Sequence, residues 1–269
     1  MSLLVETNTR LHACSIETLF ADGQGATFAC GTYELDEESK TRAGAIVIMN
    51  SHEGSLKVVK ELACESGVLD MKVSHNVLGA AMSTGKLDLY SVDRTSPEIL
   101  KNLCQVENED EGLFLSLDFD NRLASNQSTL LVDDRIAVST QSGSALVYKF
   151  AEGRLVEDLH LPSIHSLFEE AMPVWITAFN SHSRQTLLTG GDDCKFRLWD
   201  LRCADASGGS PSGLIHTNKI HTAGVTSTQW HGTREHIFVT GSYDESAYIW
   251  DERSMHQPLL HIPTGNIHT

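Results

Sequence analysis

Positively charged residues are scarce in this chain. It has 269 residues, with 20 Lys and Arg against 36 Asp and Glu, and its formal net charge is −16. A surface with this excess of negative charge repels phosphate backbones. The imbalance therefore argues against nucleic acid as a partner and favours a basic or polar protein partner.

Paired cysteines and long apolar runs are also missing. The six cysteines contain no CxxC pair, and the closest two, Cys194 and Cys203, are nine residues apart. This spacing argues against a structural zinc site and against a disulfide framework. The N-terminus lacks the basic and apolar regions of a signal peptide, and no apolar run is long enough to span a membrane. We expect a cytoplasmic protein with reduced thiols, no metal, no cofactor and no membrane partner.

The common motifs of catalysis are absent as well. There is no G-x-S-x-G, no P-loop, no G-x-G-x-x-G after a strand and no H-E-x-x-H, and the 13 histidines lack metal-ligand spacing. No long stretch has the 3.6-residue period of an amphipathic helix. Instead, short apolar or alternating runs recur, for example at 68–73, 114–119 and 175–179. These runs predict an all-β fold.

Two segments of the chain repeat each other. Residues 189–200 read TGGDDCKFRLWD and residues 240–251 read TGSYDESAYIWD, so that the two Trp-Asp pairs are 51 residues apart. Each segment reads as a strand, a tight Gly/Asp turn and a second strand that ends in Trp-Asp. A repeat of this length is typical of a β-propeller, and these two segments resemble the WD-repeat signature.

Weaker copies of the second strand end at Met49, Tyr90 and Tyr148. Together with the two Trp-Asp strands they predict a WD-repeat β-propeller with about five blades. The expected blades are residues 13–65, 66–106, 107–165, 166–217 and 218–265. An N-terminal strand at 1–12 and a tail at 266–269 flank this propeller at 13–265.

The repeat residues have a structural role in blades of this type. An Asp in the turn binds a His from the loop that enters the blade, the His binds a strand Thr, and the Thr binds the Trp indole. One such tetrad is formed by Asp244, His221, Thr240 and Trp250; the preceding blade offers Asp193, Thr189 and Trp199, with His165 as the candidate fourth member. A buried indole N–H without a partner costs about 1–3 kcal/mol, and we therefore interpret both sets as stabilising rather than catalytic.

Several further stretches are more specific than the general repeat. They are ACGTYEL at 29–35, LDMK at 69–72, SLD at 116–118, WITAFN at 175–180, GGDD at 190–193 and, the longest, REHIFVTGSYDE at 234–245. These stretches resemble the WD-repeat diphthine methylesterases of diphthamide biosynthesis. Arg-Glu-His before the strand and Tyr-Asp-Glu in the turn are not general features of WD repeats.

The resemblance implies a carboxylic ester hydrolase. Its reaction is hydrolysis of the methyl ester of methylated diphthine on elongation factor 2, which is then the partner, without a cofactor. Acyl transfer to water needs a nucleophile or an activated water, a base and donors for the oxyanion, and no motif in the sequence names these groups. Diphthine carries a quaternary ammonium, which carboxylates or aromatic faces at the mouth of the propeller would suit. The alternative is a non-enzymatic WD-repeat scaffold for protein–protein interaction, which the lack of a nucleophile motif favours.

Candidate catalytic residues follow from propeller geometry. The turns between second and third strands and the loops that enter the blades lie on one face. We expect this face to hold the candidate groups Glu245, Glu169, Glu170, His165 and Ser242, beside Tyr243 and Asp192. Glu245 and Glu169 are preferred, because either carboxylate can position water or hold a trimethylammonium group.

The resemblance also implies further blades after residue 269. A seven-bladed ring needs roughly 300 residues or more, so that we interpret the chain as truncated at its C-terminus. In an incomplete ring the strand expected at 10–14 would be unpaired or attached to a non-native neighbour. Unpaired strand edges expose backbone donors and acceptors and promote aggregation.

Overall fold

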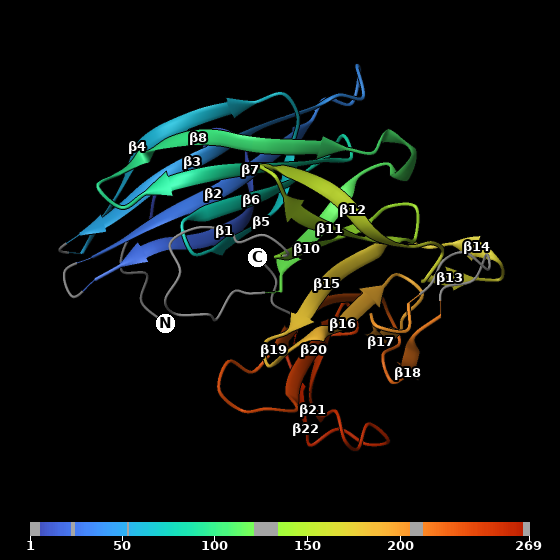
Figure 1. The fold of residues 1–269 in the computed structure, drawn as a ribbon. Coiled ribbons are helices and arrows are strands. Elements are labelled where there is room, and N and C mark those ends of the chain that lie inside the picture. Colours follow the sequence, from blue (N-terminus) through green and yellow to red (C-terminus); the bar gives the residue numbers. More distant parts are fainter. Residues whose placement is uncertain (1–5, 23–24, 53, 121–133, 205–211, 266–269) are drawn as a thin grey trace. The chain divides into compact units, whose positions relative to one another are not determined.

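The computed structural model describes residues 6–22, 25–52, 54–120, 134–204 and 212–265. These residues form five four-stranded antiparallel sheets and one two-stranded hairpin (Figure 1). In each four-stranded sheet the strands follow one another in chain order, which is the arrangement of a propeller blade. The all-β propeller fold with five blades is thereby confirmed. Residues 1–5 of the expected N-terminal strand and the tail at 266–269 lie outside the described residues.

The chain divides into two compact units, and the first contains the first two blades. The first blade consists of β1 (His12–Ala21), β2 (Gly25–Leu35), β3 (Arg42–His52) and β4 (Ser55–Cys64). The second blade consists of β5 (Val68–Ser74), β6 (Val77–Met82), β7 (Lys86–Asp93) and β8 (Ser96–Glu107), and is followed by a single 3-10 turn, η1 (Glu109–Glu111).

The second unit contains the last two blades and most of the third. The third blade consists of β9 (Phe114–Phe119), β10 (Arg135–Thr140), β11 (Ala145–Ala151) and β12 (Arg154–Leu161), and the hairpin strands β13 (Ser166–Leu167) and β14 (Glu170–Ala171) follow it. The fourth blade consists of β15 (Val174–Asn180), β16 (Ser183–Gly191), β17 (Phe196–Asp200) and β18 (Leu214–Asn218). The fifth consists of β19 (Val225–Trp230), β20 (Ile237–Ser242), β21 (Ser246–Asp251) and β22 (Leu260–Pro263).

The expectation of an unpaired strand at 10–14 is wrong. His12 and Ala13 begin β1 and pair with Tyr33 and Thr32 of β2 inside the first blade. The physical reason is proximity along the chain, because closing a short loop to the next strand costs less entropy than reaching a distant partner. At the other end of the chain, β22 pairs with β21 as the outer strand of the fifth blade.

Aromatic side chains fill the space between the fourth and fifth blades. The ring of Phe196 on β17 lies 5.8 Å from Phe238 on β20 and 5.0 Å from Trp250 on β21, measured between centroids. Trp230 adds a further ring 5.0 Å from Phe238. Such pairs contribute about 0.5–1.5 kcal/mol each beyond the area that they bury. The inner strands are buried because one blade covers the face of the next.

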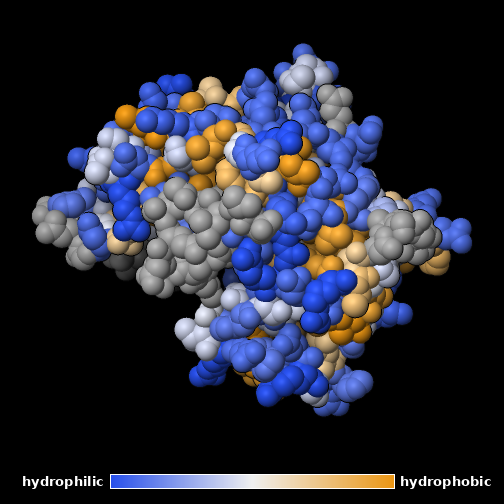
Figure 2. Space-filling model, in the orientation of Figure 1, coloured by the Kyte–Doolittle hydropathy of each residue, from blue (hydrophilic) through white to orange (hydrophobic). Residues whose placement is uncertain are grey.

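The outer strands of the first unit are more exposed. Val58 and Val59 on β4 and Ile99 and Leu103 on β8 are each between 43% and 51% exposed. Figure 2 shows hydrophobic atoms scattered among hydrophilic ones over these two strands. The two outer strands are therefore less tightly covered than β2, β3, β6 and β7, and two cavities of this unit lie beside them.

Buried charges join the third blade to the fourth. Asp120 directly follows β9, and its side chain is fully buried. It accepts hydrogen bonds from Arg135 Nε at 3.2 Å and from Arg184 Nε at 2.9 Å. Arg184 also donates to Asp134 Oδ1 at 3.1 Å, and Arg135 donates to the carbonyl oxygen of Arg184. Burial raises the pKa of Asp120, although both guanidinium groups oppose the rise.

Replacement of Asp120 by Ala is expected to lower the free energy of unfolding by about 3–5 kcal/mol, because Arg135 would remain buried without its carboxylate partner. Asp158→Ala is the matched control, since Asp158 pairs with the half-exposed Lys149 at 3.0 Å. Urea titrations of the three proteins measure the difference. Equal losses in the two variants would contradict a special role for the buried network.

Candidate functional site

Hydrogen bonds join all four residues that the motif groups in the fifth blade. His221 Nδ1 lies 2.8 Å from Asp244 Oδ2, and its Nε2 lies 3.0 Å from Thr240 Oγ1. The indole Nε1–H of Trp250 donates to the same Thr240 oxygen at 3.0 Å. Thr240 and Trp250 are fully buried and His221 nearly so. The network ties the loop that enters the blade to its turn and to its third strand.

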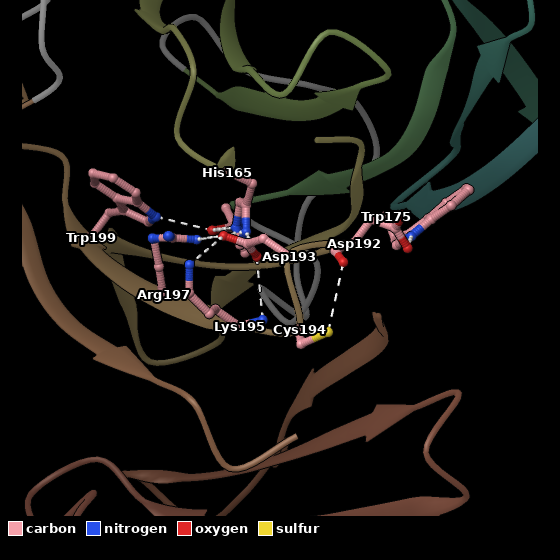
Figure 3. A network of polar contacts seen from close by, with 9 residues as sticks. His165, Trp175, Asp192, Asp193, Cys194, Lys195, Arg197 and Trp199 are labelled. Atoms are coloured by element: carbon pink, nitrogen blue, oxygen red, sulfur yellow. Dashed lines mark hydrogen bonds and ion pairs between the residues drawn. The ribbon is translucent and has the colours of Figure 1, made fainter. Parts of the chain in front are cut away.

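The fourth blade has the same network with His165 as its histidine (Figure 3). His165 Nδ1 lies 2.7 Å from Asp193 Oδ1, and its Nε2 lies 2.9 Å from Thr189 Oγ1. Trp199 Nε1–H donates to Thr189 Oγ1 at 3.0 Å. Arg197 adds a guanidinium contact at 2.9 Å to the second oxygen of Asp193, which has no counterpart in the described contacts of the fifth blade.

Each network places an acid, a histidine and a hydroxyl in the order used by hydrolase triads. Burial separates them from that chemistry, because the side chains of His165 and Asp193 are both 0% exposed. The hydroxyl of Thr189 is also occupied by the indole of Trp199. A nucleophile must reach a substrate, and therefore these buried triads stabilise the blades instead of attacking an ester.

Burial also sets the charge states in the fourth blade. It lowers the pKa of His165, and this effect outweighs the opposing attraction of Asp193. Burial alone would raise the pKa of Asp193, but hydrogen bonds from His165 and Arg197 outweigh it and hold that pKa below its ordinary value. The folded state thus contains a neutral imidazole beside an ionised carboxylate.

Replacement of His221 or Asp244 by Ala is expected to reduce the free energy of unfolding by about 1–3 kcal/mol, because each change leaves buried polar partners without a hydrogen bond. The exposed His256 provides the control variant His256→Ala. Chemical denaturation gives the three values. A loss for the control as large as that for His221→Ala would rule out a specific contribution from the tetrad.

The neutral state of His165 predicts a pH dependence of stability. As the pH falls through the ordinary histidine value of 6.5, the unfolded chain binds a proton at this position and the folded chain does not. Folding stability contributed by His165 is therefore full above that pH and is lost below it. The difference in melting temperature between about pH 8 and about pH 5.5 should shrink in His165→Gln and stay unchanged in His256→Gln. An undiminished difference in His165→Gln would refute this assignment of charge.

Glu169 and Glu170 lie on the hairpin of β13 and β14, which begins directly after the buried His165. Phe168 and Glu169 form its turn with φ angles of 50° and 68°. Two successive residues with positive φ are the signature of a tight hairpin turn of the primed type. The backbone N–H of Met172 donates to the carbonyl of His165 at 3.0 Å and closes the hairpin. Both glutamates are exposed, and Phe168 beside them is 91% exposed.

Ser242 and Glu245 lie in the turn between β20 and β21. The Ser242 hydroxyl donates to the carbonyl of Ala223 at 3.0 Å and accepts from the backbone N–H of Asp244 at 3.1 Å. These two contacts fix the turn and engage the hydroxyl. Glu245 is exposed with a φ of 61°, and its carbonyl accepts from the N–H of Thr264 at 2.8 Å. The carboxylate of Glu245 is accessible to a ligand.

A patch of aromatic and acidic side chains lies where β15, the turn between β16 and β17 and the turn between β20 and β21 come together, and no motif in the sequence groups it. Trp175 Nε1–H donates to Asp192 Oδ1 at 3.0 Å, and Figure 3 shows Asp192 turned away from the neighbouring Asp193 toward this indole. Gly224 lies against both, since a Cβ there would be 2.7 Å from Asp192 Oδ1. Tyr243, 68% exposed, donates its N–H to the carbonyl of Gly224 at 3.1 Å.

No group of three or more His, Cys, Asp or Glu side chains within the described ranges is arranged to hold a metal ion. In the same ranges, no helix is long and apolar enough to cross a bilayer. The chemistry available at the rim of the fourth and fifth blades is that of carboxylates, hydroxyls and aromatic rings. Carboxylates and aromatic faces together suit a cationic ligand.

Comparison with known proteins shows which families the chain resembles. The family model "WD domain, G-beta repeat" matches residues 163–200 and 212–251. A diphthine methyltransferase homolog of Dictyostelium discoideum is 28% identical over 97% of this chain and 75% of its own length. Diphthine methyltransferase of Homo sapiens is 30% identical over 97% of this chain and 61% of its own length. Over 97% of its length the chain is similar to diphthine methyltransferases, and its fourth and fifth blades match the WD-repeat model.

Two further facts limit what this similarity shows. The chain spans about three fifths of the length of its human homologue. Among solved structures, a chain in the "Crystal Structure of Mitotic Checkpoint Complex" matches 95% of this chain and 64% of its own length, with a TM-score of 0.63 at 17% identity. That likeness shows the fold alone.

Proposed function

We propose that this protein hydrolyses the methyl ester of methylated diphthine on elongation factor 2 and acts in the cytoplasm. The observation that carries the proposal is the similarity to diphthine methyltransferases across 97% of the chain. The match includes both the WD blades and the N-terminal unit, which the general WD family model does not match. A generic scaffold would share the repeat residues without this extended similarity.

The reaction is acyl transfer to water. The oxygen of water bonds to the ester carbonyl carbon, the bond from that carbon to the methoxy oxygen breaks, and methanol and a carboxylate are formed. An activated water and donors for the oxyanion accelerate this step. His165 and His221 are held inside the tetrads, so we assign water activation to the exposed carboxylates Glu245 and Glu169.

The cationic part of the substrate calls for a separate subsite. A quaternary ammonium has no N–H to donate, and aromatic faces near a negative charge bind it best. Trp175 on β15 and Asp192 and Tyr243 in the two neighbouring turns provide these groups. We assign the trimethylammonium group of methylated diphthine to this patch, with the ester directed toward the carboxylates of the rim.

Hydrolysis in water enriched in oxygen-18 tests the reaction. The purified protein is expected to release one methyl group as methanol from elongation factor 2 carrying methylated diphthine, with the label in the product carboxylate. Mass spectrometry of the modified peptide and of methanol detects both. Label in methanol would indicate attack on the methyl carbon, and an unchanged substrate would refute the activity.

Two classes of variant separate binding from chemistry. Asp192→Asn is expected to raise KM about fivefold to tenfold with kcat little changed, because it removes the charge beside the ammonium. Glu245→Gln and Glu169→Gln are expected to lower kcat, and Asp200→Asn, which removes the negative charge that pairs with the exposed Arg202, is the control. Full turnover in both glutamate variants would show that the water is activated elsewhere.

One observation favours the scaffold as a second candidate function. Both histidine–acid pairs of the tetrads are buried, and motif reasoning finds no other triad. A protein that only presents the rim to elongation factor 2 would bind the methylated form and release it unchanged. Tight binding without methanol release would favour this function over the esterase.

A further inference from the structure

The second blade has lost the tetrad that stabilises the fourth and fifth blades. Tyr90 on β7 pairs with Leu78 on β6, as Trp199 on β17 pairs with Leu187 on β16. The tyrosine therefore stands where the fourth blade has its tetrad tryptophan. The threonine is missing too, since Ala80 takes the register position of Thr189.

Two small hydroxyl side chains replace the histidine and the aspartate. Thr84 precedes Tyr90 by six positions, the same interval as between Asp193 and Trp199. Its hydroxyl lies 3.3 Å from that of Ser66 in the loop that enters the blade. An imidazole and a carboxylate fill much more space than two hydroxyls, so the substitution leaves room beside the blade.

A cavity of about 290 Å³ occupies this region between the outer strands of the first unit. Its polar lining includes Glu65, Lys86, Asp88, Tyr90 and Gln105, and its apolar lining includes Leu62. Burial raises the pKa of Cys64 in the same wall to about 11, so that this thiol is neutral. The remaining titratable acids and bases are two carboxyl groups and one ammonium. Burial raises the pKa of Asp88, and the charge of Lys86 and the hydrogen bond from Tyr90 oppose the rise.

The buried carboxylate of Asp88 has one oxygen without a hydrogen bond. Asp88 is 6% exposed, and its Oδ2 accepts from the hydroxyl of Tyr90 at 3.1 Å. Its Oδ1 has no hydrogen-bond partner among the described residues. Lys86 Nζ lies 3.7 Å from that oxygen and bonds instead to Glu65 Oε2 at 3.1 Å. A buried acceptor left in this state is costly, and a ligand with N–H groups relieves the cost.

The fourth blade shows which group fits such a position. Asp88 stands opposite Ala80 in the register, as Arg197 stands opposite Thr189. Arg197 directs its guanidinium at the buried Asp193 at 2.9 Å. In the second blade the carboxylate is on the strand and the guanidinium is missing from the described contacts. The two blades are thus electrostatic inverses at one register position.

We propose that the cavity beside β7 is a binding site for a guanidinium group on a short apolar stem. The planar fork of N–H donors can reach Asp88 Oδ1 and the rim carboxylate of Glu65 together, which a compact ammonium does less well. Leu62, Met82 and Leu100 line the path of the stem. The volume accommodates one side chain of this size, carried by a free molecule or by an arginine of a partner protein.

Calorimetric titration of the full chain tests the site with three probes. They are agmatine, the capped peptide Gly-Arg-Gly and its citrulline analogue, which keeps the shape and removes the charge. Binding of both guanidinium probes and not of the citrulline peptide is expected. Binding of agmatine alone assigns the site to a free molecule, and comparable binding of the peptide assigns it to a partner's arginine. Equal binding of the citrulline peptide, or binding by none of the probes, overturns the proposal.

Variants locate the binding. Asp88→Asn is expected to weaken agmatine binding about tenfold or more, because it removes a charge-assisted hydrogen bond. Asp93→Asn, on the same strand and outside the cavity, is the matched control with unchanged affinity. Lys86→Met removes the competing cation and is expected to tighten binding, an effect that a merely structural role does not give. Unchanged affinity in Asp88→Asn or weaker binding in Lys86→Met would refute the site, whatever the outcome of the esterase assay.

Discussion

The hydroxyl of Thr189 accepts a hydrogen bond from Trp199 and also meets the ring of His165, so that a single oxygen joins two strands to the loop that enters the blade. This arrangement meets a requirement of blade packing, namely that polar groups buried between sheets need hydrogen-bond partners. Each sheet has two faces, and the fourth and fifth blades bury the faces that they turn toward each other. An indole or imidazole can be placed there only if its N–H groups find partners. The tetrad satisfies all of them at once and fixes how the loop meets the sheet.

The imidazole, carboxylate and hydroxyl of a tetrad bond to one another, and therefore they are not available to react with a substrate. His165 is the residue type expected of a general base, and its hydrogen bonds to Asp193 and Thr189 have the order of contacts and the distances of a catalytic triad. A triad that is fully buried has no path to a substrate, and the lowered pKa of His165 reflects that isolation. The same physics that makes the blade stable therefore moves the search for reactive groups to the exposed turns above it.

The architecture is predictable from the sequence because its signals are local. Alternating runs give strands, the Trp-Asp repeat gives the blade length, and fixed intervals place an Asp, a Thr and a Trp at register positions that hydrogen bonds then join. Contacts between distant residues without a motif were not predictable. The interblade network around Asp120 and the Trp175–Asp192 pair each depend on side-chain direction. The pairing of β1 with β2 is a hairpin between adjacent strands, whereas the expectation for residues 10–14 was based on closure of a complete ring.

The second blade shows the physical consequence of losing the tetrad. Replacing an imidazole and a carboxylate by Ser66 and Thr84 removes one set of internal partners, and Tyr90 then turns to Asp88 for its hydrogen bond. The hydrogen bonds of this blade do not satisfy all of its buried polar atoms, because one oxygen of Asp88, a residue that lines the cavity, has no hydrogen-bond partner among the described residues. A blade whose buried polar atoms all have internal partners has no free hydrogen-bonding group for a ligand. A blade with an unsatisfied buried atom beside a cavity has such a group at a fixed position. Loss of a structural motif in one repeat is thus a physical route by which a propeller acquires a binding site between its blades, separate from the rim where the ester chemistry is assigned.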